Sequence, residues 1–83
     1  MDIRNHLIET QVNDLLIFRT NIDKKSEFLS IKYDLQKIAG VRLCTIDLDD
    51  CDRVLRVECE NVPLDRIVEE VARHGFVCEE LAD

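Results

Sequence analysis

The chain has 83 residues, of which 46% are hydrophobic, and this length allows one domain with a single core. Its 18 acidic and 11 basic side chains give a net charge of −7, which argues against nucleic acid and membrane surfaces as partners, because both are anionic. No apolar run approaches the roughly 20 residues of a membrane span, and the start lacks the pattern of a secretory signal, so we expect a cytoplasmic protein.

Residues 1–13 are predicted to be an extension ahead of the domain, which takes up residues 14–83. The apolar residues of this extension are spaced as in a short amphipathic helix, although an added strand or a loose arm also fits them: Ile3, Leu7, Ile8 and Val12. Residues 15–20 are an apolar and β-branched run, which is typical of a strand in the middle of a sheet.

A helix is predicted from Asp23, whose side chain can accept hydrogen bonds from the first amides, to Gly40. Its apolar residues recur at spacings of three and four and should form one buried stripe: Phe28, Ile31, Leu35 and Ile38. The outward positions include four lysines, so the exposed side of this helix should be locally basic: Lys24, Lys25, Lys32 and Lys37.

Two strands with alternating apolar residues are predicted at residues 41–48 and 54–59, on either side of an acidic turn. Antiparallel pairing about this turn brings Cys44 near Val57 and Ile46 near Leu55. Both apolar sets then share one face of the hairpin.

Pro63 suits the first turn of a second helix, which should end at Gly75 and bury one stripe: Leu64, Ile67, Val68 and Val71. Residues 76–78 are predicted to form the last strand. The order strand, helix, hairpin, helix, strand predicts an α+β fold, the ferredoxin-like βαββαβ sandwich, with a four-stranded antiparallel sheet and both helices on one face.

From about residue 15 to residue 81, the sequence resembles the heavy-metal-associated (HMA) domains of copper chaperones and metal-pumping ATPases. The resemblance is carried by four segments in a fixed order: Ile-Ala-Gly-Val at 38–41, Cys-Thr-Ile-Asp-Leu at 44–48, the helix 64–71, and His-Gly-Phe at 74–76. It implies the same ferredoxin-like fold. In the family, a Met-Thr-Cys-x-x-Cys loop at the start of the first helix holds a soft ion such as Cu(I) with two thiolates.

Counting back from Gly40, this loop falls on residues 22–27, where Lys24 and Glu27 stand in place of the two cysteines. The other positions of this degenerate site are Asp23, Lys25, Ser26 and Phe76. Soft ions prefer thiolates, and an ammonium group has no lone pair to offer a metal. We therefore expect the scaffold without its metal function, and no cofactor.

No two of the four cysteines are spaced as a C-x-x-C pair, and in a reducing compartment all four should be free thiols. Cys44, Cys59 and Cys78 alternate with polar residues in strands, so we expect them in the core. Cys51 lies in the acidic turn and should be exposed. It is the remaining candidate ligand, although the carboxylates around it should damp its reactivity.

The acidic turn is interpreted as a solvated surface rather than a Ca²⁺ or Mg²⁺ site, because it lacks the glycine and the flanking helices of a calcium loop: Asp47, Asp49, Asp50 and Asp52. His74 is interpreted as a residue at a helix C-terminus. Neither His74 nor His6 has a nucleophile at a suggestive spacing, and no phosphate-binding glycine loop is present, so we predict that the protein is not an enzyme.

Three functions remain open at this point. The leading hypothesis is a degenerate HMA-like module that contacts another protein or itself, with the basic first helix steering a partner of complementary charge. The second is Cu or Zn binding, as a buffer or chaperone, through cysteines outside the usual loop. The third is a small-molecule sensor, because ferredoxin-like domains serve many unrelated functions.

Overall fold

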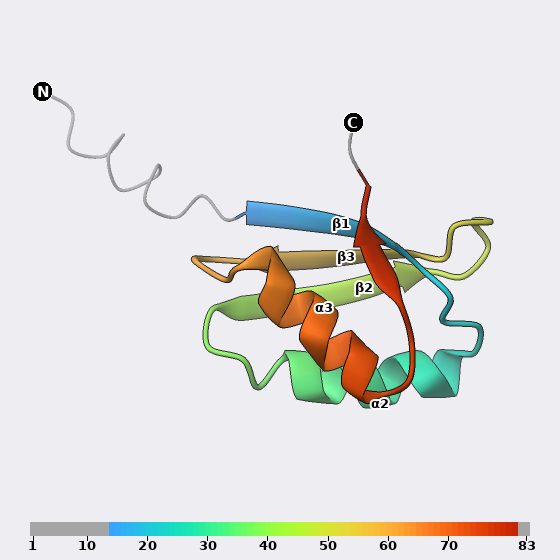
Figure 1. Cartoon of the computed structure of the whole chain (residues 1–83), viewed down its shortest axis with the longest axis horizontal. Helices are drawn as coiled ribbons and strands as arrows, with labels where there is room; N and C mark the ends of the chain where they lie inside the picture. Colours follow the sequence, from blue (N-terminus) through green and yellow to red (C-terminus); the bar gives the residue numbers. More distant parts are fainter. Residues whose placement is uncertain (1–13, 82–83) are drawn as a thin grey trace, which may run out of the picture.

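The computed structural model describes residues 14–81, and they form the predicted βαββαβ arrangement (Figure 1). The elements in chain order are β1 (Asp14–Thr20), α2 (Lys25–Leu35), β2 (Val41–Asp47), β3 (Val54–Cys59), α3 (Leu64–Arg73) and β4 (Cys78–Glu80). Our prediction for residues 1–13 lies outside the described residues. Neither α2 nor α3 is long and apolar enough to cross a membrane.

The four strands form one antiparallel sheet in the order β2-β3-β1-β4, so β1 is a central strand, as predicted. The hairpin has the predicted register, with Cys44 opposite Val57 and Ile46 opposite Leu55. Its one irregularity is a shift between Val41 and Leu43. Both helices cover the same face of the sheet (Figure 1), which confirms the ferredoxin-like architecture.

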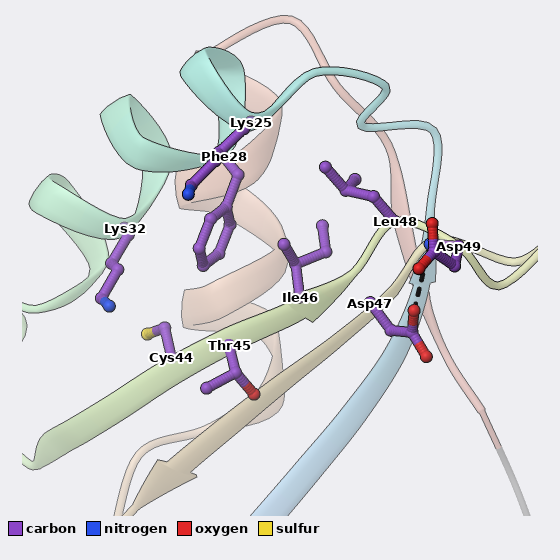
Figure 2. Close-up of a pocket in the computed structure, with 9 residues that line it drawn as sticks. All are labelled: Lys25, Phe28, Lys32, Cys44, Thr45, Ile46, Asp47, Leu48 and Asp49. Atoms are coloured by element: carbon purple, nitrogen blue, oxygen red, sulfur yellow. Dashed lines mark hydrogen bonds between the residues drawn. The ribbon is translucent and has the colours of Figure 1, made fainter.

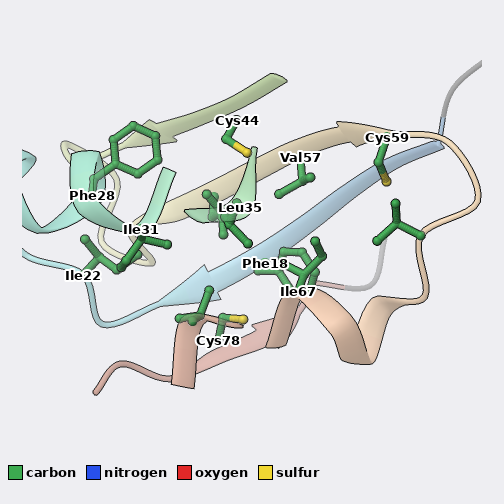
Figure 3. Close-up of a cluster of buried hydrophobic side chains, with 13 residues drawn as sticks. Phe18, Ile22, Phe28, Ile31, Leu35, Cys44, Val57, Cys59, Ile67 and Cys78 are labelled. Atoms are coloured by element: carbon green, nitrogen blue, oxygen red, sulfur yellow. The ribbon is translucent and has the colours of Figure 1, made fainter. Parts of the chain in front are cut away.

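The core lies between the sheet and the two helices (Figure 3). Phe18 on β1 is fully buried there, together with Ile31 and Leu35 of α2 and Ile67 of α3. The sulfur-bearing side chains of Cys44, Cys59 and Cys78 belong to the same cluster, which confirms that they act as core residues. Burial of this apolar surface is the main force that holds the helices on the sheet.

The helices and the last strand differ from the prediction at their ends. Helix α2 begins at Lys25 with Lys24 as its N-cap residue, so Asp23 does not cap it. It ends at Leu35, and residues 36–39 continue as turns up to Gly40, whose positive φ of 98° suits glycine. Strand β4 begins at Cys78 rather than at residue 76.

Candidate functional site

Three chain segments meet at one end of the sheet, which we call the loop end: residues 21–24 after β1, residues 48–53 between β2 and β3, and residues 74–77 before β4. Thr20 joins the first segment to the second, because its amide donates to the carbonyl of Asp52 (2.9 Å) and its hydroxyl to the carbonyl of Arg53 (2.7 Å). Asn21 joins the first to the third through Val77, whose amide donates to Asn21 Oδ1 (2.8 Å). The loop end is therefore a connected surface.

The segment between β1 and α2 is held by contacts on both sides of its chain. Ile22 is fully buried in the core, and its amide donates to Thr20 Oγ1 (3.2 Å). Asp23 is exposed and forms an ion pair with Arg53, in which Nη2 lies 3.0 Å from Oδ1. These contacts hold in place the residues that the resemblance aligns with the start of the metal loop of HMA domains.

Glu27 closes this segment from within the helix. Its Oε1 accepts hydrogen bonds from the amides of Asp23 (3.1 Å) and Lys24 (3.0 Å), which are among the open donors at a helix start. Lysine has no acceptor, so the side chain of the N-cap residue Lys24 cannot cap the helix. Glu27 caps the start of α2 instead. The sequence already carried this signal, because a glutamate three residues after a helix start is one half of a capping box.

The predicted positions of the degenerate site are mostly exposed, and they lie at the loop end and on the first turn of α2. Asp23, Lys24, Lys25 and Ser26 are exposed, and Glu27 is half-buried. Phe76, from the segment before β4, is also half-buried and packs against the core. The residues therefore gather at one end of the fold, but the donors they present are an ammonium, a hydroxyl and carboxylates.

The sulfur atoms of the three core cysteines are poorly suited to bind a metal ion. Burial raises the pKa of Cys44 to about 11, and the nearby ammonium of Lys32 only partly opposes this. Burial also raises the pKa of Cys78 to about 11 and that of Cys59 above its ordinary value. Metal binding needs the thiolate, which these three residues disfavour at neutral pH.

Cys51 is exposed, as predicted, and lies in the turn 48–53 at the loop end. Its sulfur lies within 4.8 Å of ligand oxygens of Asp50 and Asp52. These carboxylates already have partners in the protein: Asp50 Oδ1 accepts from the amide of Asp52 (2.8 Å), and Asp52 faces Arg19 at 4.0 Å. A thiol beside two carboxylates fits neither an all-oxygen site for Ca²⁺ nor a thiolate pair for Cu(I).

A second polar cluster, which no sequence motif indicated, lies between the helices. His74 Nε2 lies 2.8 Å from Asp34 Oδ2, which joins the end of α3 to α2. Glu70 is buried, with a side chain 8% exposed, and its Oε1 accepts from Arg66 (3.2 Å). The ligand atoms of Asp34, Glu70 and His74 lie within 4.8 Å of one another. Glu70 lies three positions after the core residue Ile67, on the same side of the helix, and this spacing could have predicted that Glu70 is buried.

No family model matches the chain, and no curated protein matches it in sequence. Among solved structures, the chain is 28% identical to the yeast copper transporter domain Ccc2a, with a TM-score of 0.73 over 83% of this chain and 96% of that domain. A copper-binding domain from HMA7, a P-type ATPase, is 21% identical (TM-score 0.71; 82% and 93% covered). The first domain of the human copper chaperone CCS is 19% identical (TM-score 0.66; 84% and 97%). The chain therefore has the fold of the heavy-metal-associated domains.

Proposed function

We propose that this chain is a non-catalytic, HMA-like interaction module that contacts another protein and holds no metal ion at the position of the HMA loop. The observation that carries the proposal is the use made of Glu27. Its carboxylate accepts two loop amides, at 3.1 Å and 3.0 Å, and the resemblance aligns Glu27 with the second cysteine of the family. Lys24, which the resemblance aligns with the first cysteine, is an exposed N-cap residue.

The chemistry of these two side chains supports the proposal. A Cu(I) ion is held by soft donors, and an ammonium group beside the position would repel it. A carboxylate that already accepts two amide hydrogens would have to give them up, and the helix start would lose its cap. The loop therefore favours an empty, internally bonded state over one that holds a metal ion.

The comparisons support a role in contacts between proteins. Ccc2a, to which this chain is similar, has been solved in a complex with Atx1 and Cu(I). The exposed surface of α2 in this chain offers two large apolar side chains, Leu29 (50% exposed) and Tyr33 (67% exposed). Because they are four positions apart, they lie next to each other on one face of the helix, where a bound protein would cover both.

Cu(I) binding is the competing function, and it is favoured by the likeness to Ccc2a, which was solved in the Cu(I)-loaded state. In the described residues, Cys51 is the one exposed cysteine that could take part. A single thiol gives weak binding, so a copper protein would need a second sulfur from a partner or a rearranged chain.

The experiment is a Cu(I) titration under reducing conditions against a competing chromophoric chelator. We expect the native chain to bind no tighter than about micromolar, and the Cys51→Ser variant to behave in the same way. The matched variant Lys24→Cys with Glu27→Cys restores the pair of sulfurs on the same scaffold and should bind far more tightly. Tight binding by the native chain, lost in Cys51→Ser, would assign it to copper handling instead.

A second measurement addresses the protein contact itself. Solution mass and retention of partners on the immobilised chain should show either self-association or a specific bound protein. A strictly monomeric chain that retains no partner would count against an interaction module, whatever the copper titration gives.

A further inference from the structure

Strand β2 leaves an open edge on the sheet. Within residues 14–81, β2 pairs only with β3, so the backbone N–H and C=O groups on its other side have no strand to bond. The opposite edge strand, β4, has three residues, whereas β2 has seven. The irregularity in β2 is confined to Val41 and Leu43, so residues 44–47 remain regular. Such an edge is a template for an added strand.

A groove of about 400 Å³ runs between this edge and α2 (Figure 2). Its lining from β2 and the following turn consists of the six consecutive residues 44–49. Successive side chains of a strand point to opposite faces, so a groove on one face would be lined by every second residue. A lining of consecutive residues means that the groove opens along the outer edge of β2.

The α2 side of the groove places charge and apolar surface in a fixed order. Lys25, Phe28 and Lys32 line it in this order along α2, and the phenyl ring points toward β2 (Figure 2). Phe28 is 6% exposed and lies opposite the half-buried Ile46. Neither lysine forms an ion pair with another residue of the part of the chain that the structure describes. The α2 side of the groove is thus basic over an apolar floor, whereas Asp47 and Asp49 add two carboxylates on the β2 side.

We propose that this groove and the edge of β2 bind an extended segment of another protein, which adds to the sheet as a fifth strand. The proposal deepens the proposed function and rests on it, since it names the surface and the kind of partner. Peptides that add to a sheet edge gain affinity from backbone hydrogen bonds and specificity from alternate side chains.

The order of the lysines and Phe28 defines the side chains that the segment should carry. Lys25 and Lys32 are two helical turns apart, about 10 Å along the axis. Every second residue of an added strand faces α2, and residues four apart are separated by about 13 Å. The matching pattern is acidic, any, apolar, any, acidic. Because the chain carries a net charge of −7, a segment acidic throughout would be repelled, so its acidic side chains belong on the α2 side only.

The test uses a fluorescein-labelled, end-blocked peptide, Thr-Glu-Thr-Val-Thr-Glu-Thr, and fluorescence anisotropy with the full chain. We expect saturable binding that weakens at least tenfold in the double variant Lys25→Glu, Lys32→Glu. The matched control is Lys37→Glu with Arg73→Glu, which changes the net charge equally but lies outside the groove. This control should bind the peptide like the native chain, and circular dichroism checks that both variants fold.

Further peptides separate the two parts of the proposal. A peptide with lysine in place of both glutamates should bind at least tenfold more weakly, because it meets the ammonium groups. Two peptides are N-methylated, one at the odd-numbered and one at the even-numbered residues. Only one of these two sets donates its N–H groups to β2, so one of the two peptides should lose binding.

No saturable binding at millimolar peptide overturns the proposal, as does equal weakening in both charge variants or equal binding of the lysine peptide. These outcomes are independent of the copper titration. A chain that binds copper tightly and also binds the peptide refutes the proposed function and leaves the groove assigned. A chain that does neither refutes the groove alone.

Discussion

The two glycines allow the cost of a close backbone contact to be measured separately from the cost of a positive φ. Gly40 has φ of 98° and Gly75 has φ of 88°, so alanine is strained at both positions. A Cβ on Gly40 would lie 2.4 Å from the carbonyl oxygen of Glu60 and 2.9 Å from Val62 Cγ2. A Cβ on Gly75 would meet nothing within 4 Å.

The expected magnitudes follow from these surroundings. A left-handed backbone costs an L-residue about 1–2 kcal/mol, and both Gly75→Ala and Gly40→Ala carry this cost. Gly40→Ala also forces an extra atom against the backbone carbonyl of Glu60, in a segment that the hydrogen bond from the Glu60 amide to the Gly40 carbonyl (2.8 Å) holds close. Overpacking of this kind adds about 1–3 kcal/mol.

Thermal and urea unfolding of the two variants and the native chain measure the difference. For a domain of this size, each kcal/mol lowers Tm by about 4–8 °C, so Gly75→Ala should lose roughly 4–16 °C and Gly40→Ala at least about 4 °C more. The smaller entropy of alanine in the unfolded chain affects both variants alike and cancels from the comparison. Equal losses, or a larger loss in Gly75→Ala, would refute the account of the contact at Glu60.

Three other predictions concern the core and its thiols. Under reducing, native conditions a thiol reagent should label Cys51 rapidly, and the other three cysteines only after unfolding. Burial raises the pKa of Cys44 and Cys78 from 9.0 to about 11, so the urea midpoint should be unaffected by these thiols below about pH 9 and fall as the pH rises toward 11, because the unfolded chain ionises first. The fall should be smaller in Cys44→Ala. Phe18→Ala, which empties a fully buried site on the central strand, should cost about 3–5 kcal/mol in the same urea measurement.

The fold was predictable because the apolar residues of each helix and strand follow a local spacing, and only one arrangement of the elements buries all of them. In the hairpin, alternation with a period of two requires Cys44 to share a face with Val57, and a shift by one residue would put the apolar residues of the two strands on opposite faces. The helix stripe at Phe28, Ile31 and Leu35 is equally restrictive, and all three are buried. Burial of apolar surface selects one register, so the sequence pattern is sufficient.

The details of the site depend on contacts that no local pattern encodes. Asp34 and His74 meet across the two helices although they are 40 positions apart in the chain. The predicted cap at Asp23 was wrong because Arg53, from another turn, binds its carboxylate while Glu27 takes the amides. Short polar side chains have several nearby partners of similar energy, and the tertiary structure decides between them.

The same loop contacts come from the chain itself and hold the segment between β1 and α2 in place. Ile22 anchors the segment in the core, Glu27 bonds its amides, and Asp23 ties it to Arg53, so every restraint on the loop comes from the chain itself. A loop restrained by an ion would lose its shape on removal of the ion, whereas this loop gains its order from the folding of the domain. Its exposed side chains can therefore change without a cost to the core, which is what the proposed interaction role requires.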